Sequence, residues 1–160
     1  MKYKKKEDDI KEKIIMELPS FINELLLFLS SGMVLNEALV VIAKEYQKHK
    51  TENNVFADEF CKIYYDSQKA RRSFVYMFNA YGKRSQIKEL SKLTNILEDG
   101  EKKGINLTEK LSELSKNLWE DRKKKSMEKI RMAETKMSFP LGLLLIALII
   151  ITAAPAMMQM

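Results

Sequence analysis

The last 24 residues of the chain, from Met137 to Met160, contain no charged side chain. At about 1.5 Å of rise per residue, a helix over residues 139–158 is long enough to cross the roughly 30 Å hydrocarbon core of a bilayer. A helix that is apolar on every side can also lie inside a large soluble protein, but a chain of 160 residues has too little mass to surround it. We therefore predict one transmembrane helix and a short outer tail over residues 137–160.

All charged residues lie before that stretch, and they make up 31% of the chain. Glycine and proline are scarce, at five and three residues, whereas Lys, Glu, Leu and Ala are abundant. This composition favours helices over short strands and tight turns. The sequence therefore predicts an all-α fold, with a charged lead-in over residues 1–14 that is disordered or frayed, and an antiparallel helical bundle over residues 15–136.

Apolar residues recur at helical spacing along the bundle region. We expect structure to begin near Leu18, with Pro19 in the first turn of a helix, and Asn36 to cap the second helix. The sequence does not decide whether residues Ser67 to Arg72 interrupt the helix or continue it. About six helices are expected, over residues 18–31, 36–46, 55–64, 74–82 and 85–104, and from Thr108 into the span.

Two segments of the bundle region repeat at an offset of 72 residues and share the pattern G-x-x-L-[N/T]-E-x-L. In a helical hairpin, the glycine allows the left-handed turn that closes the first helix, the leucine fills the turn, and Asn or Thr caps the next helix. The pattern predicts a pseudo-duplicated bundle. Its turn residues are Gly32, Leu35, Glu37 and Leu39 in the first copy, and Gly104, Leu107, Glu109 and Leu111 in the second.

Residues for catalysis or metal binding are few. His49 is the only histidine and Cys61 the only cysteine, so a histidine-based metal or catalytic site and an internal disulfide lack partners. The Gly100 to Gly104 stretch lacks the preceding strand and the GK[ST] ending of a phosphate-binding loop. We expect no catalytic residue, metal or cofactor, and hence a protein that acts by binding.

The formal net charge of +6 raises the possibility of a nucleic-acid partner. Acidic residues are scattered through the bundle region, however, so no long basic face is apparent, and we expect no nucleic acid. Basic residues instead gather before the span, where they would attract lipid headgroups and keep the bundle on the cytoplasmic side, with the C-terminus outside. This basic collar comprises Arg122, Lys123, Lys124, Lys125, Lys129, Arg131 and Lys136.

Three stretches of the chain carry a resemblance to a known family. Residues 32–39 read GMVLNEAL, and residues 104–119 read GINLTEKLSELSKNLW. Over residues 122–156, a charged helix runs into a proline-bounded span, with Phe139 and Pro140 at its entrance and Pro155 and Ala156 at its exit. Together these stretches resemble the type II secretion system F family, the inner-membrane platform proteins of secretion systems, pili and archaella, whose turn has the pattern G-x-x-L-x-x-A-L. The chain most resembles the C-type platform protein of tight-adherence pili.

The resemblance implies a cytoplasmic bundle that performs no catalysis and couples a secretion or pilus ATPase to pilin assembly at the cell inner membrane. Family members commonly carry additional spans before this domain, so a second platform subunit is an expected partner. Pilin, membrane lipid and further copies of the chain are also expected partners. The alternative is a membrane-tethered regulatory or adaptor protein whose helical domain binds a cytosolic partner.

Overall fold

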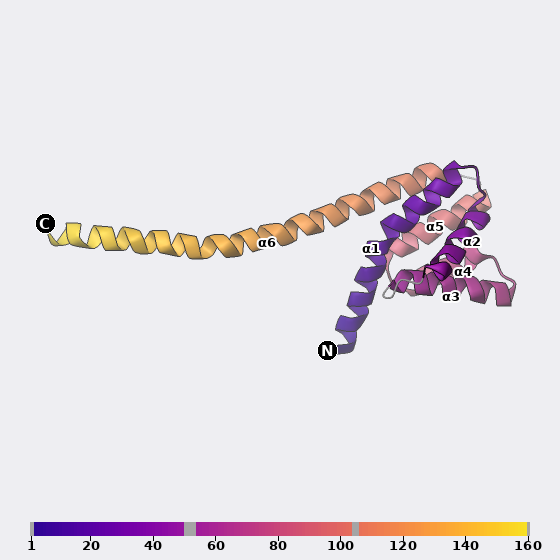
Figure 1. Ribbon diagram of the computed structural model, residues 1–160, viewed down its shortest axis with the longest axis horizontal. Coiled ribbons are helices and arrows are strands. Elements are labelled where there is room, and N and C mark those ends of the chain that lie inside the picture. The colour runs from indigo at the N-terminus through magenta and orange to yellow at the C-terminus, as the bar shows by residue number, and fades with distance from the viewer. Residues whose placement is uncertain (1, 50–53, 104–105, 160) are drawn as a thin grey trace. The chain divides into compact units, whose positions relative to one another are not determined.

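The computed structural model describes residues 2–49, 54–103 and 106–159, all of its regular structure there is helical, and the predicted all-α class is confirmed (Figure 1). The helices are α1 (Lys2–Ser30), α2 (Leu35–Lys48), α3 (Val55–Ala70), α4 (Phe74–Arg84), α5 (Lys88–Lys103) and α6 (Leu107–Met158). The chain divides into two compact units, Met1–Trp119 and Glu120–Met160.

The expected start of the first helix near Leu18 is wrong, because α1 begins at Lys2 and contains Pro19 in its interior. The buried face of α1 begins one turn earlier than expected. Ile14, four residues before the fully buried Leu18, is also buried. The charged residues before Ile14 are good helix formers, and Lys11 pairs with Glu7 at 3.7 Å across one turn.

Phe21 of α1 lies in the core of the first unit. Its ring makes edge contacts with Phe56 and Phe60 of α3, at centroid distances of 5.1 and 5.0 Å, and with Phe78 of α4 at 6.1 Å. Such contacts add about 0.5–1.5 kcal/mol each beyond the burial of the rings. Helix α1 also contacts α2 and α5, so it joins the other helices around one core.

Two further boundaries differ from expectation. The N-cap of α2 is Val34 and not Asn36, which lies in the first turn. Helix α4 does not stop at Gly82 but continues to Arg84, because Gly82 is a packing position against α5 and not a helix end. The open question between α3 and α4 is settled by a break: α3 ends with Arg71 in the left-handed conformation, and Ser73 caps α4.

Candidate functional site

The first G-x-x-L turn closes α1 with a left-handed glycine. Gly32 has a φ of +90°, its N–H donates to the carbonyl of Leu29, and the N–H of Met33 donates to the carbonyl of Phe28. These two bonds form a Schellman motif, in which glycine occupies the left-handed position that side chains disfavour. Leu35, which follows, is buried at 8% exposure, so it fills the turn as the first residue of α2.

Glu37 and Leu39 complete that first turn motif, on opposite sides of α2. Glu37 is exposed in the first helical turn, where its charge favours the positive end of the helix dipole. Leu39 is fully buried in the core.

The second turn motif also has an exposed glutamate and a buried last leucine, but its first leucine, Leu107, is half-buried where Leu35 is buried. Leu107 begins α6 and lies against Gly100 of α5, where a Cβ atom would stand 2.8 Å from the Leu107 Cδ1 atom. Glu109 is exposed and accepts a 2.8 Å hydrogen bond from the Asn106 side chain, whereas Leu111 is fully buried. Gly104, the expected counterpart of Gly32, lies outside the described residues.

Most buried positions agree between the two halves at the offset of 72 residues, although Leu107 and Tyr46 are only half-buried where their counterparts, Leu35 and Leu118, are buried. The pairs Leu18 and Leu90, Phe21 and Leu93, Leu25 and Leu97, Leu39 and Leu111, and Ile42 and Leu114 are all buried. The two halves therefore place corresponding side chains in the same core.

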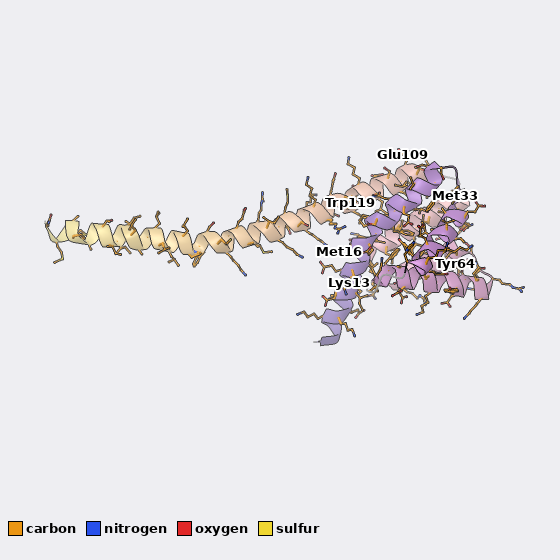
Figure 2. The ribbon with its side chains drawn as sticks, in the orientation of Figure 1. Lys13, Met16, Met33, Tyr64, Glu109 and Trp119 are labelled. Carbon is orange, nitrogen blue, oxygen red and sulfur yellow. The ribbon has the colours of Figure 1, made fainter. Side chains whose placement is uncertain are left out.

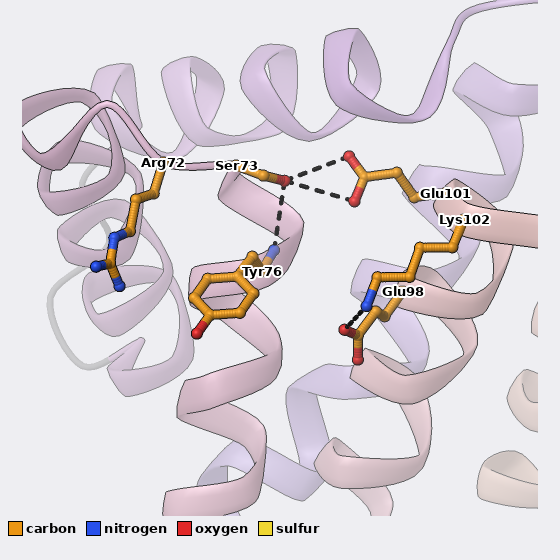
Figure 3. A pocket seen from close by; sticks show the side chains of 6 residues that line it. All are labelled: Arg72, Ser73, Tyr76, Glu98, Glu101 and Lys102. Carbon is orange, nitrogen blue, oxygen red and sulfur yellow. Dashed lines mark hydrogen bonds and ion pairs between the residues drawn. The ribbon is translucent and has the colours of Figure 1, made fainter.

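Beside the first turn, Glu101 of α5 connects the starts of two other helices, and Figure 3 shows its bonds to Ser73. It accepts hydrogen bonds from the Asn36 amide of α2 at 3.1 Å and from the Ser73 hydroxyl at 3.3 Å. The Ser73 hydroxyl also accepts a bond from the backbone N–H of Tyr76, so one carboxylate holds the cap of α4 in place. A cavity of about 460 Å³ lies here, lined by Arg72, Ser73, Tyr76, Glu98, Glu101 and Lys102.

The charges of this cavity are already bonded within the protein. Glu98 accepts bonds from Lys102 and from the buried Asn79, and the hydrogen bond from Lys102 lowers the pKa of the Glu98 carboxyl. Arg72 lies 6.0 Å from the ring centroid of Tyr76. Both carboxylates, Glu98 and Glu101, thus accept hydrogen bonds from donors within the protein, an arrangement suited to fixing helices.

The histidine and the cysteine, which were the candidates in the sequence for metal binding or catalysis, lie at a helix end and in a helix-packing contact. His49 ends α2, and the Cys61 thiol is half-buried and donates to the Ala43 carbonyl at 3.5 Å. In the described part of the chain, no three or more His, Cys, Asp or Glu side chains gather as metal ligands.

The second unit consists of the remainder of α6, whose described side chains are all exposed (Figure 2). The seven basic residues of the collar, from Arg122 to Lys136, project from this helix, which then continues through Pro140 and Pro155. Phe139 is 72% exposed and Ala156 is also exposed, so both ends of the predicted span are unburied. Exposure of so many large apolar side chains is unfavourable in water and favourable in lipid.

Among the described residues, α6 is the one helix long and apolar enough to cross a membrane, and its apolar window is unburied. The fold and this helix define a membrane protein with a helical bundle before a single candidate span. The chain matches the family described as type II secretion system (T2SS), protein F, over residues 21–155. It belongs to this family, and the family-level resemblance found in the sequence is confirmed. No curated protein and no solved structure matched in the corresponding comparisons.

Two polar connections were missed in the sequence. Glu101 is exposed in the last turn of α5, four residues after the buried Leu97, and a charged residue at such a position gives no sign in the sequence of its contacts with Asn36 and Ser73. The Ser115 hydroxyl of α6 lies 2.9 Å from the Asn23 side-chain oxygen of α1 and donates to it. These residues are 92 positions apart, and no local pattern indicates their contact.

Proposed function

We propose that the chain is a non-catalytic platform component of a pilus or secretion machine at the inner membrane. The bundle lies in the cytoplasm and binds the motor ATPase, and the C-terminus is outside. The span contacts a second platform subunit and pilin, and tight-adherence pili are the proposed subclass. The family match carries the proposal, because it covers both the bundle from Phe21 and the span to Pro155.

The distribution of charge and burial supports this arrangement. The bundle has its own core, to which all six helices contribute, and its surface charges suit an aqueous compartment. The collar immediately before the span would hold that side in the cytoplasm. The carboxylates of the Glu98 and Glu101 cavity are engaged by protein donors, which supports binding over catalysis as the function.

Co-purification from native membranes tests the proposal. The chain with an affinity tag before Met1 is extracted in mild detergent, and bound proteins are identified by mass spectrometry. We expect a secretion ATPase together with a second platform subunit or a pilin. A tagged single-span protein of the same membrane serves as the control. Recovery of the chain without any protein of a pilus or secretion machine contradicts the proposal.

Deletion of the gene separates the platform from the regulatory alternative. A platform component is required for surface pili or secretion and leaves transcription of the machine's genes unchanged. Altered transcription with normal assembly would support the membrane-tethered regulator instead. Complementation with the intact chain restores assembly if the loss is specific.

A further inference from the structure

Residues 120–138 of α6 separate their charges onto two sides of the helix. At about 100° per residue, the four acidic residues Glu120, Asp121, Glu128 and Glu134 fall on one side, together with the basic Lys124 and Arg131. The opposite side has five basic residues and no acidic one. We call it the acid-free face, and its basic residues are Arg122, Lys123, Lys125, Lys129 and Lys136.

The acid-free face is exposed and carries apolar residues among its lysines. Ile130 and Met137 lie on it and are 59% and 80% exposed. In the part of the chain that the structure describes, no carboxylate lies within ion-pair distance of Lys125, Lys129 or Lys136. A helix face with unpaired lysines and exposed apolar side chains is typical of helices that bind at a membrane interface.

The membrane is the nearest candidate for the occupant of this face. Lys136 precedes the first residue of the span, Phe139, by three positions, so the headgroup layer and this helix are adjacent once the span is inserted. Anionic headgroups attract each nearby Lys or Arg, and each such residue raises the membrane-binding constant about fivefold. Positive charge on the helix and negative charge on the lipid are complementary.

We propose that the acid-free face binds the surface of anionic phospholipid bilayers, with the helix leaning onto the headgroups. In an upright helix, Lys125 would stand about 16 Å further from the membrane than Lys136, beyond the screening length of about 8 Å at physiological salt. The lean therefore brings Lys125 and Lys129 to the lipid.

The proposal rests on insertion of the span, which is part of the proposed function, and not on the ATPase, pilin or second subunit. Resistance of the reconstituted chain to carbonate extraction reports insertion separately. If the chain does not insert, the prediction of a transmembrane helix is contradicted. If it inserts but the acid-free face makes no contact that depends on anionic lipid, the proposal that this face binds anionic bilayers is contradicted.

The test uses the full chain with Cys61→Ser and a single fluorescent label. The label is placed on the acid-free face through Ser126→Cys, or on the acidic side through Thr135→Cys. Each protein is inserted into vesicles of phosphatidylcholine alone or mixed with phosphatidylglycerol, and quenching by the neutral quencher acrylamide is measured. We expect phosphatidylglycerol to protect the label at position 126 and not the label at position 135.

Two variants with equal loss of charge show whether the face matters. Lys125→Gln with Lys129→Gln should abolish the protection, because two contacts worth about fivefold each are lost. Lys124→Gln with Arg131→Gln removes the same charge from the acidic side and should leave the protection in place. Equal protection of both labels, no dependence on phosphatidylglycerol, or equal effects of both variants would overturn the proposal. Protection in native membranes alone would also overturn it and indicate an acidic protein partner.

Discussion

Gly82 of α4 lies so close to Thr94 of α5 that a Cβ atom on Gly82 would stand 2.4 Å from the Thr94 hydroxyl oxygen. Thr94 is fully buried, and its hydroxyl donates to the Ser91 carbonyl at 3.2 Å, so it has little room to move. The glycine therefore sets how closely α4 and α5 approach each other. This packing role explains why Gly82 lies within a helix although glycine is a poor helix former.

Gly82→Ala should lower the free energy of unfolding by about 1–3 kcal/mol, the usual cost of overpacking a core. Denaturant unfolding of the detergent-solubilised chain measures the change. Thr94→Ala in the same protein should recover part of the loss, because it removes the nearest atoms. Gly100→Ala is the matched control, with a smaller expected loss, since its nearest neighbour is the flexible end of Leu107. Equal losses at both glycines would contradict the packing argument.

The turn at Gly32 gives a different kind of glycine prediction. No atom lies within 4 Å of a Cβ placed there, so a side chain meets no obstacle, but the φ of +90° disfavours it. Gly32→Ala should cost about 1 kcal/mol of unfolding free energy, and Gly32→Asn less, because Asn tolerates left-handed backbone. If the duplication is real, Gly104→Ala has a similar cost. Unchanged unfolding of Gly32→Ala would contradict the role of this turn.

Arg71, at the end of α3, is a position where a glycine should increase the stability of the protein. Its φ of 51° and ψ of 39° are left-handed, which costs a side chain about 1 kcal/mol relative to glycine. Arg71→Gly should therefore raise the melting temperature. Lys69→Gly, placed within the last turn of the same helix, should lower it, and that contrast excludes a general effect of glycine on α3.

Glu24 and Tyr46 predict a dependence of stability on pH. The Tyr46 hydroxyl donates to the Glu24 carboxylate at 3.2 Å, but burial outweighs this bond and raises the pKa of Glu24 above its usual 4.5. The folded protein then binds a proton more tightly than the unfolded chain, so stability rises as pH falls from neutral through the raised pKa. Glu24→Gln should flatten this part of the profile, as measured by urea unfolding at several pH values. An identical slope in the variant would exclude Glu24 as the source.

Sequence periodicity predicted the helices well where apolar residues alternate with a charged face, as in α2 and α5. It failed where tertiary contacts decide. The buried face of α1 begins at Ile14, whose burial depends on the rest of the core, and the position of Gly82 inside α4 depends on its contact with Thr94 of α5. Glu101 is the clearest case, because its role is to accept hydrogen bonds from Asn36 and Ser73, and only the folded chain brings these residues together.

Topology is the last prediction, and it follows from the collar and the span. Seven basic residues lie within the seventeen positions before Met137, and no charged residue follows them. Retention of Lys and Arg on the cytoplasmic side should therefore place the C-terminus outside. Alkaline phosphatase, which is active only outside the cytoplasm, should be active when fused after Met160, and green fluorescent protein fused there should be dark. The same reporters fused before Met1 should give the opposite signals. Fluorescence of the C-terminal fusion would show that the topology is the reverse of the one predicted.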